Sequence, residues 1–371
     1  MATVPLTVVV APDSFKGSLP ALEVAEAIAE GWRTIRPDDS LVLVPQADGG
    51  EGTLHSVEAA MPGTVRHPAG LVTGPDGRAT PGEWLELPDG VAVVELAQTS
   101  GLPLMVSLDA LGATTRGLGE VIRAALACRP TALVIGLGGS ASTDAAAGAL
   151  AALGMRFTDD DGTEVADGGG QLARISRIDR AAFAPPPAGG VVLLTDVTAA
   201  LLGPAGAAAV FGPQKGASTA QVAALDAALA HFADLLGGDL VAPGTGAAGG
   251  AGYGFASAWG ATIRPGADYL AELTGLSARL ERADIMLTGE GRFDEQSLGG
   301  KVVGQLLARA ASAGVRAGVI AGQLTVTTDV WTASLTDLAG SVESAMAETG
   351  RWLRAAGARA ARELPADYSG K

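Results

Sequence analysis

Residues 6–18, LTVVVAPDSFKGS, decide the fold class of this chain. The apolar, β-branched run at residues 6–10 ends before Pro12, and such a run is typical of a strand buried in a parallel sheet. A helix is expected next, because Ser18 can cap it, Pro20 fits its first turn, and apolar residues then recur with a period near 3.6. A strand, a polar turn and a helix in this order predict an α/β fold.

The same pattern recurs along the chain. Further apolar runs predict strands at residues 41–44, 132–135, 191–194 and 285–287, with helices after two of them at residues 145–153 and 302–311. Each run leads into a glycine-rich or acidic turn. Because ligands in open parallel sheets bind at the carboxyl ends of the strands, we expect the functional site in these turns.

The composition excludes several classes of function. The 371 residues include 40 acidic and 25 basic side chains, and the resulting net charge of -15 disfavours binding to nucleic acid or to an anionic membrane surface. The single cysteine, Cys128, excludes an internal disulfide and a thiolate metal cluster. With 53 glycines and only 4% aromatic residues, the core must be built largely from Ala, Val and Leu.

A cytoplasmic location is expected. The first basic residue is Lys16, so the beginning of the sequence lacks the positive region of a signal peptide. Residues 240–263 carry no charge and are long enough to span a bilayer, but they consist mainly of Gly and Ala and include Pro243. We expect a glycine-rich loop and a small-residue helix there, and no membrane span.

The first two turns carry acidic residues among glycines and hydroxyls. In the first, residues 11–18, Asp13, Ser14 and Lys16 stand where a helix begins, an arrangement suited to binding an anion. In the second, residues 47–53, the carboxylates of Asp48 and Glu51 could hold Mg²⁺ with a bound phosphate. Ordinary capped or solvated turns are the alternatives for both.

The third turn, residues 136–144, is GLGGSASTD. Its backbone amides, at Gly138 and Gly139 among others, could cradle phosphates. Residues 136–141 also match the dinucleotide pattern G-x-G-x-x-A, with acids at 159–161 about twenty residues further on as candidate ribose ligands. An NAD(P)-dependent dehydrogenase is therefore the alternative function, although no histidine is evidently placed for hydride transfer.

The fourth and fifth turns offer acids beside cations. Asp196, at the end of a predicted strand, is placed to orient or deprotonate an alcohol, and Lys215 is placed to meet an anion. The fifth turn, residues 288–297, carries acidic side chains and Arg292 packed into six consecutive residues. Holding these charges together costs free energy unless a cation or polar ligand shares them. Surface residues and a structural ion-pair loop are the alternatives.

Taken together and in order, six segments resemble the type I glycerate kinases, and the similarity runs from about residue 8 to residue 323. The segments are APDSFKGSL (11–19), ADGGEGT (47–53), GLGGSASTDAAAGALAALG (136–154), TDVTAALLGPAGAAAVFGPQKGA (195–217), GAAGGAGYG (246–254) and LTGEGRFDEQSLGGKV (287–302). The chain departs from the family pattern at Ala199, where Asn is usual, at Ser142-Thr143, and at Ala145 and Ala146, where Gly is usual. None of these departures removes a charged group.

The resemblance implies ATP-dependent phosphorylation of D-glycerate with Mg²⁺, and the family is associated chiefly with 2-phosphoglycerate rather than 3-phosphoglycerate. Phosphoryl transfer needs positioning and charge neutralisation more than covalent catalysis, so carboxylates, cations and glycine loops suffice. The expected partners are a small-molecule substrate and a nucleotide, with no nucleic acid and no membrane; the oligomeric state stays open.

The turns then supply candidate residues for each role. Asp196 is the first candidate for the base that accepts the glycerate hydroxyl proton, and Asp294 is the second. The remaining candidates are Lys16 for catalysis; Asp13, Ser14, Lys215 and Arg292 for the substrate; Gly138, Gly139, Ser140, Asp144 and Gly289 for the nucleotide; and Asp48, Glu51 and Glu290 for Mg²⁺.

The resemblance also implies two α/β domains. A flavodoxin-like domain would be formed by both chain ends, residues 1–70 and 283–371, with a second α/β domain, residues 71–282, inserted and the active site in the cleft between them. Boundaries near Gly70 and Arg282 fit the proline-rich stretch at residues 62–90 and the strand that begins again at Ile285.

Overall fold

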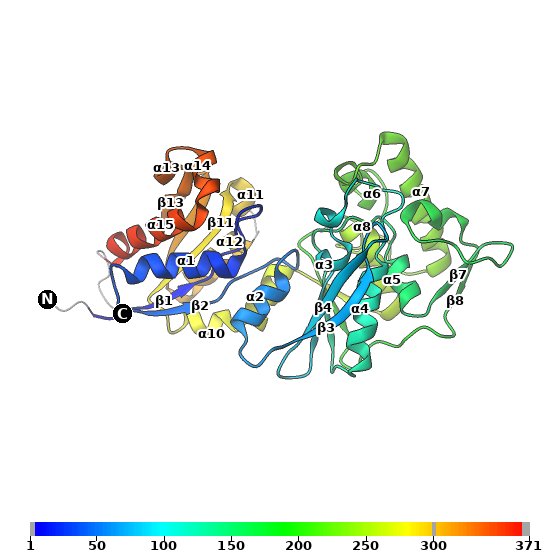
Figure 1. Cartoon of the computed structure of the whole chain (residues 1–371), viewed down its shortest axis with the longest axis horizontal. Helices are drawn as coiled ribbons and strands as arrows, with labels where there is room; N and C mark the ends of the chain where they lie inside the picture. Colours follow the sequence, from blue (N-terminus) through cyan, green and yellow to red (C-terminus); the bar gives the residue numbers. More distant parts are fainter. Residues whose placement is uncertain (1–3, 299–301, 366–371) are drawn as a thin grey trace. The chain divides into compact units, whose positions relative to one another are not determined.

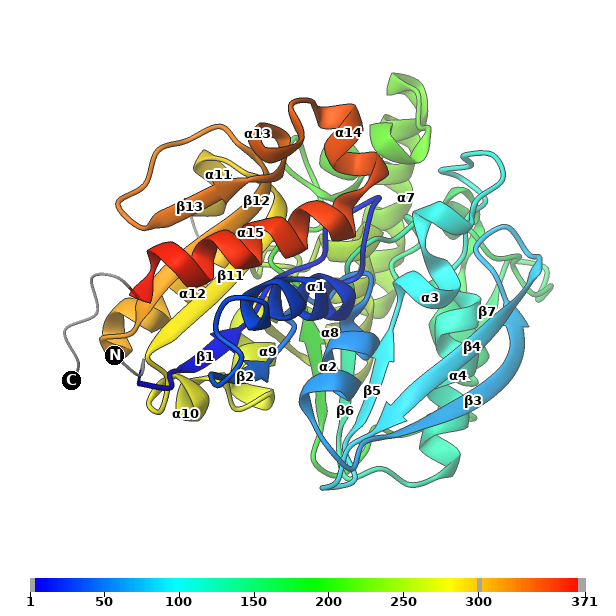
Figure 2. The same ribbon diagram turned by 60° about the vertical axis from the view of Figure 1, so that its left-hand side comes forward.

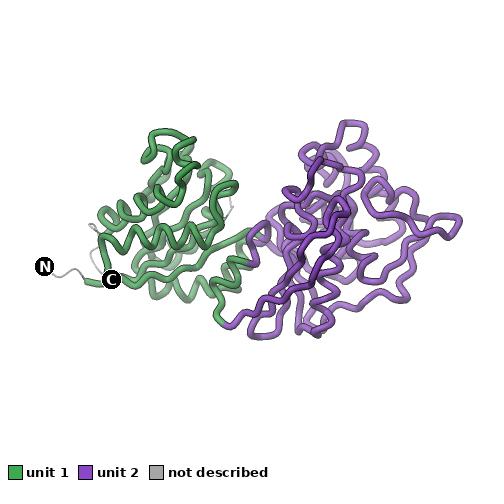
Figure 3. The backbone as a smooth tube through the Cα atoms, viewed as in Figure 1, with its two compact units in different colours: residues 1–48, 55–62, 267–371 green, residues 49–54, 63–266 purple. Residues whose placement is uncertain are grey.

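The computed structural model describes residues 4–298 and 302–365. The chain divides into two compact units (Figure 3). Unit 1 comprises Met1–Asp48, His55–Pro62 and Ala267–Lys371, and unit 2 comprises Gly49–Leu54 and Gly63–Gly266. Each unit has its own sheet (Figure 1).

The sheet of unit 1 is wholly parallel and combines both ends of the chain. Its strand order is β13-β12-β11-β1-β2, and counted along the chain within this unit the order is 2-1-3-4-5. The predicted α/β class is confirmed. The strands are β1 (Thr7–Val10), β2 (Ser40–Leu43), β11 (Ile285–Phe293), β12 (Arg316–Leu324) and β13 (Trp331–Ser334).

Alternating residues of β1 face two separate cores. Val8 and Val10 pack into a cluster with α1 (Ala21–Arg33) and α15 (Thr349–Glu363), which lie side by side on one face of the sheet (Figure 2). Val9 packs on the opposite face, in a cluster supplied by α10 (Leu276–Leu280) and α12 (Val302–Ala313). The continuous apolar run therefore reflects burial on both faces of a central strand.

The first helix starts later than the sequence suggests. The expected cap at Ser18 is wrong: α1 begins at Ala21 with Pro20 at its N-cap, and no side chain caps it. Ser18 instead donates its N–H to the Phe15 carbonyl at 2.8 Å, inside a tight turn closed by Phe15 and Leu19. The polar residues of the first turn thus stand in a loop, not in a helical turn.

The sheet of unit 2 has four parallel strands extended by an antiparallel hairpin. Its order is β10-β9-β6-β5-β4-β3, with parallel pairing from β10 to β5. The strands are β10 (Thr262–Arg264), β9 (Val191–Leu194), β6 (Leu133–Gly136), β5 (Ala92–Glu95), β4 (Ala79–Glu86) and β3 (Val65–Thr73). The carboxyl ends of four parallel strands therefore meet at one edge.

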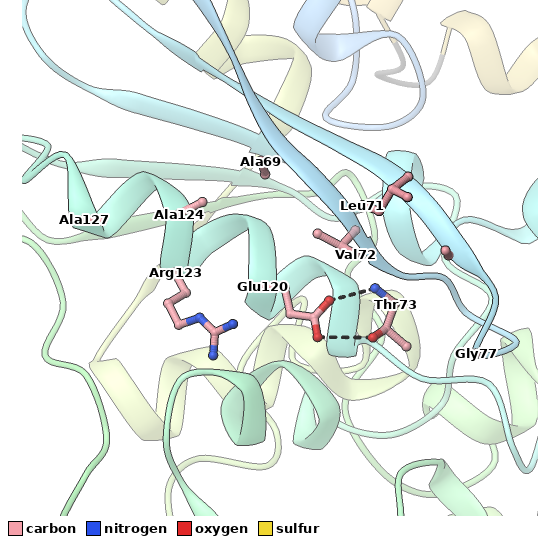
Figure 4. Close-up of a pocket in the computed structure, with 10 residues that line it drawn as sticks. Ala69, Leu71, Val72, Thr73, Gly77, Glu120, Arg123, Ala124 and Ala127 are labelled. Carbon is pink, nitrogen blue, oxygen red and sulfur yellow. Dashed lines mark hydrogen bonds between the residues drawn. The ribbon is translucent and has the colours of Figure 1, made fainter.

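The β3–β4 hairpin occupies the proline-rich stretch, and α4 (Arg116–Ala127) packs against it. A surface pocket lies between them (Figure 4). There the Glu120 carboxylate accepts hydrogen bonds from the Thr73 N–H at 2.7 Å and from the Thr73 hydroxyl at 3.1 Å. This contact fastens the end of β3 to the helix.

The uncharged stretch at residues 240–263 contains α8 (Ala247–Trp259), and its helical backbone is broken at Ala248, Gly249 and Gly250. The predicted glycine-rich loop and small-residue helix are confirmed. Among residues 4–298 and 302–365, no helix is long and apolar enough to cross a membrane.

The remaining elements are short connections and covering helices. They are α2 (Thr53–Ala60), α3 (Ala97–Ser100), α5 (Ala147–Ala152), α6 (Ala207–Phe211), α7 (Thr219–Leu236), α9 (Gly266–Leu273), α11 (Glu295–Leu298), α13 (Leu335–Ala339), α14 (Val342–Ala347), the 3₁₀ turns η1 (Leu102–Leu104), η2 (Gly169–Arg174) and η3 (Pro213–Lys215), and the strands β7 (Arg156–Thr158) and β8 (Arg177–Asp179).

Candidate active site

In unit 1, the first and fifth turns lie next to each other. The Asp13 N–H, just after β1, donates to the Gly289 carbonyl in β11 at 2.8 Å. These two strands are adjacent in the sheet, at the point where the strand order reverses. Such a switch point is where open α/β sheets bind ligands.

Three carboxyl groups share this corner. Burial, together with the nearby charges of Asp48 and Glu290, raises the pKa of Asp13 to about 7, although the Ser14 N–H at 2.6 Å and the charge of Lys16 oppose the shift. The Lys16 ammonium lies 3.9 Å from the Asp48 carboxylate and is 76% exposed. The corner therefore brings three carboxyl groups close enough for the charges of Asp48 and Glu290 to act on Asp13.

The corner suits a magnesium ion that is shared with phosphate. Within the described residues, no three acidic, histidine or cysteine side chains are arranged to hold a metal by themselves. Magnesium in kinase sites is usually held through one or two carboxylates together with water and substrate phosphates. A divalent cation here would relieve the repulsion that raises the pKa of Asp13.

Two other residues of the fifth turn, Asp294 and Gly289, make structural contacts. The Asp294 carboxylate accepts the N–H groups of Gln296 at 3.0 Å and Ser297 at 3.3 Å, so it caps α11, and it lies 3.5 Å from Arg292. At Gly289, an added Cβ would lie 2.1 Å from the Ile320 carbonyl in β12, so strand packing already explains this glycine. Residues 299–301 of the motif lie outside the described residues.

In unit 2, the second and third turns are joined through their backbones. The Gly138 N–H donates to the Gly49 carbonyl at 3.0 Å, and a Cβ at Gly138 would lie 2.4 Å from the Gly50 Cα. The Gly138 N–H, expected to cradle phosphate, is therefore already committed. Glu51, in the second turn, is exposed. Gly139, in the third turn, has a φ of 76°, which lies in the left-handed region that favours glycine.

Glu95, at the carboxyl end of β5, was missed by the sequence analysis. It is only 3% exposed, and its two oxygens accept the N–H groups of Gly52 and Leu54, each at 3.0 Å. Burial raises the pKa of this carboxyl to about 7, and the Glu51 charge adds to the shift. The only sequence signal was a lone glutamate at the end of an apolar strand.

The geometry of the third turn does not fit a dinucleotide-binding loop. Such a loop leads directly from a strand into a helix, whereas α5 begins only at Ala147, eleven residues after β6 ends at Gly136. Asp159, the candidate ribose ligand, accepts the Thr163 N–H at 2.9 Å and pairs with Arg174 at 3.3 Å. The dehydrogenase alternative therefore loses its structural support.

A buried lysine of the fourth turn, Lys215, contacts residues of the third turn. Lys215 is 2% exposed, and its ammonium donates to the Ser140 hydroxyl at 2.9 Å and to the Ser142 carbonyl. Burial lowers its pKa to about 7, and the charge of Asp144 opposes the shift. No ion pair with Lys215 occurs in the part of the chain that the structure describes.

Asp144 lies fully buried beneath this cluster. One carboxylate oxygen accepts the Thr115 N–H at 3.0 Å, the Thr115 hydroxyl at 2.8 Å and the Gly148 N–H at 3.3 Å, and burial raises the pKa of the group. It therefore supports the start of α4, and the whole residue is enclosed. Ala145 and Ala146, which follow it, have φ values of 49° and 62°, a region that favours glycine.

Several hydroxyls of the third turn and of Ser100, whose carbonyl accepts the Ala141 N–H at 2.9 Å, lack a protein partner in the described residues. Within residues 4–298 and 302–365, the side-chain oxygens of Ser100, Ser142 and Thr143 are buried without a hydrogen bond. Buried polar groups are normally paired with protein, water or ligand. The third turn thus combines a buried cation with hydroxyls that have hydrogen-bonding capacity to spare.

Asp196 is exposed at the end of β9, the strand next to β6. One of its oxygens accepts the Gly266 N–H at 2.8 Å. Because the parallel strands β6 and β9 end at the same edge, Asp196 and the third turn belong to one edge of unit 2.

Comparison with known proteins places the chain in a family. The model of the glycerate kinase family matches residues 8–365. The chain is 42% identical over 306 residues to the glycerate 2-kinase of Escherichia coli, covering 80% of each protein, and 40% identical over 305 residues to the glycerate kinase of Bacillus subtilis, covering 80% of this chain and 79% of that protein.

A solved structure agrees over the whole length. It is a Salmonella typhimurium LT2 protein provisionally assigned as glycerate kinase 2, with a TM-score of 0.82 and 36% sequence identity, and the match covers 98% of this chain and 99% of that one. The sequence resemblance is thereby confirmed. The chain belongs to the glycerate kinase family and is a phosphotransferase.

Proposed function

We propose that this enzyme transfers a phosphoryl group from ATP to D-glycerate, with Mg²⁺, and releases 2-phosphoglycerate. Membership of a kinase family implies ATP as the donor. The choice of the 2-hydroxyl is supported by the relative from Escherichia coli, which is named a glycerate 2-kinase.

The single observation that carries the proposal is the buried ammonium of Lys215. In the described part of the chain, a hydroxyl and a carbonyl accept hydrogen bonds from this ammonium, and the charge of Asp144 offsets the cost of its burial only in part, so an anion that completes its surroundings would stabilise it. D-Glycerate is a small anion with a carboxylate and two hydroxyls. We assign its carboxylate to Lys215 and a hydrogen bond from the substrate to Ser140.

The acidic corner of unit 1 is assigned to Mg²⁺ and phosphate. Asp48 and Glu290 are the candidate metal ligands there, and Glu51 is a third candidate on the second turn. The ion would neutralise charge on the phosphates when bound. Lys16 and Arg292, both largely exposed, can reach phosphate oxygens, and Ser14 can donate a hydrogen bond to one of them.

Asp196 is the proposed base. Its carboxylate would accept the proton of the 2-hydroxyl as that oxygen forms a bond to the γ-phosphorus. The bond between the γ-phosphorus and the β–γ bridging oxygen breaks at the same time, and ADP leaves with its electron pair. Asp294 is the second candidate, and its capping of α11 argues against it. The Asp196→Asn variant should therefore lose turnover far more than Asp294→Asn, and the reverse result would exchange the two roles.

We also infer that the two units are domains. The strand order 2-1-3-4-5 of unit 1 is that of a flavodoxin-like sheet, built here from both ends of the chain. The chain between those ends supplies a second α/β domain, inserted into the first.

The deciding experiment is phosphorus NMR of the purified protein with ATP, Mg²⁺ and D-glycerate, with L-glycerate as the control. We expect a new monoester signal that grows together with ADP. Phosphate on the secondary 2-hydroxyl couples to one proton and gives a doublet, whereas the primary 3-hydroxyl gives a triplet. A triplet would correct the position of transfer, and no signal with either enantiomer would refute the substrate.

A further inference from the structure

Glu95 stabilises the start of a helix that belongs to a different part of the chain. It ends β5, and its carboxylate accepts the N–H groups of Gly52 and Leu54, each at 3.0 Å. Leu54 lies in the first turn of α2 and Gly52 immediately precedes the helix, where backbone N–H groups have no acceptor within the helix. Glu95 thus supplies a cap 41 residues away along the chain from Leu54.

The loop before α2 is also held at its other end. The Gly49 carbonyl accepts the Gly138 N–H at 3.0 Å, and the Thr53 hydroxyl closes the turn by donating to the Gly50 carbonyl at 2.7 Å. Glu51 stands between these two attachments. Its backbone is therefore fixed on one side by the third turn and on the other side by Glu95.

A buried glutamate is an expensive way to cap a helix. A serine, threonine or asparagine on the helix itself would satisfy the same N–H groups without burying a charge. Two acids stand near each other here, since the charge of Glu51 acts on Glu95, and the Arg66 charge opposes it only in part. A capping role alone does not explain the choice of residue.

We propose that Glu95 is a positioning residue for phosphoryl transfer: it holds the Gly49–Thr53 loop so that the Glu51 carboxylate is presented to the metal–nucleotide complex. The assignment of Glu51 rests on the proposed function, whereas the attachment of the loop does not. Residues that orient a metal-binding group usually affect metal affinity 10- to 100-fold when they are replaced.

The test compares Glu95→Gln, Glu95→Asp and Glu86→Gln. In Glu95→Gln the shape is kept but one oxygen becomes an NH₂ group, so one of the two N–H donors loses its acceptor. Glu95→Asp keeps a carboxylate on a shorter side chain. Glu86, on the neighbouring strand β4, is 45% exposed and bonds to His67, so its variant is the matched control.

The first readout is hydrogen exchange of the Gly52 and Leu54 amides in the full-length protein, measured by NMR. We expect exchange at least 10-fold faster in Glu95→Gln, an intermediate rate in Glu95→Asp and no change in Glu86→Gln. The free energy of unfolding of each variant, measured in parallel, separates a local loosening from global destabilisation. Unchanged exchange in Glu95→Gln would overturn the proposed attachment.

The second readout is the binding of Mn²⁺-ATP, followed by electron paramagnetic resonance without glycerate. We expect the dissociation constant to rise at least 10-fold in Glu95→Gln, to recover partly in Glu95→Asp, and to stay within twofold of wild type in Glu86→Gln. If the Gly52 and Leu54 amides exchange faster in Glu95→Gln but Mn²⁺-ATP binding is unchanged, Glu95 acts only as a helix cap and its positioning role is overturned.

These readouts keep the two proposals separate. If the wild-type protein binds Mn²⁺-ATP in a way that depends on Glu95 but does not phosphorylate glycerate, the proposed substrate fails and the role of Glu95 stands. If glycerate is phosphorylated and Glu95→Gln binds Mn²⁺-ATP like wild type, the substrate stands and the role of Glu95 fails. Should Glu95→Gln not fold, the same comparisons are made with Glu95→Asp.

Discussion

Replacing Lys215 with methionine should stabilise the protein near pH 6 while impairing its function. The lysine is 2% exposed, and burial lowers its pKa from the ordinary value of 10.5 to about 7. Methionine has a similar unbranched shape and carries no charge to bury. The substitution therefore removes the cost of burying an ammonium and, with it, the group that we assign to the substrate carboxylate.

The magnitude follows from the two pKa values. A pKa of 10.5 in the unfolded chain and about 7 in the folded protein corresponds to a penalty of at most about 5 kcal/mol on the charged lysine. Methionine leaves the Ser140 hydroxyl and the Ser142 carbonyl without their donor, which costs about 1–3 kcal/mol. The net gain in the free energy of unfolding is therefore about 2–4 kcal/mol at pH 6.

The gain should depend on pH in a defined direction. Below pH 7, the lysine is charged in both the folded and the unfolded state, so the wild type carries the full penalty. Between pH 7 and pH 10.5, only the unfolded state keeps the proton, and the free energy of unfolding of the wild type rises with pH. At pH 9, a little more than half of the way through that window, the wild type has regained about 3 kcal/mol on a scale of about 1.4 kcal/mol per pH unit, so the advantage of methionine should have largely vanished.

The assay is urea denaturation of wild type, Lys215→Met and Arg177→Met at pH 6 and pH 9, followed by circular dichroism. Arg177 is exposed on β8 of the same unit, so its variant should show no pH-dependent difference from wild type. The kcat/KM for glycerate should fall about 10- to 100-fold in Lys215→Met, as expected for a lost hydrogen bond to a charged group. Lower stability of Lys215→Met by the same amount at both pH values would refute the reasoning.

Three further predictions concern the backbone and the acidic corner. Gly289→Ala should lower the free energy of unfolding by more than about 2 kcal/mol, because the new Cβ would lie 2.1 Å from a carbonyl oxygen. Gly291→Ala should be tolerated, because the nearest contact of its Cβ would be at 3.7 Å. Thermal unfolding of the two variants compares them. Ala146→Gly should be nearly neutral because it relieves a φ of 62°, whereas Ala149→Gly inside α5 should cost about 1–2 kcal/mol in urea denaturation. Because the pKa of Asp13 is raised from 3.8 to about 7, this group's contribution to stability is full below pH 3.8 and is lost as the pH rises through 7; Asp13→Asn should flatten that decline, measured by urea denaturation at pH 4 and pH 8.

The sequence alone determined the fold class and where chemistry could occur. Apolar runs that end in polar turns are local signals, because burial on both faces of a sheet demands a continuous hydrophobic strand whatever the neighbours are. The run at residues 6–10 and the run at 285–287 were identified in this way, and both are central strands of one sheet. Six ordered motifs were likewise enough to indicate the family.

Only the tertiary structure decided which of these residues meet and what each one does. A parallel sheet is assembled from contacts between distant segments, so the approach of Asp13 to Gly289, 276 residues apart, has no local signature. The burial of Lys215 and Glu95 depends on what packs around them, and a lone charged residue in a sequence does not show whether it will be enclosed. The same holds for the cap that Asp294 supplies to α11 and for the close approach of Gly289 to Ile320, because hydrogen bonds and packing contacts are properties of the folded chain.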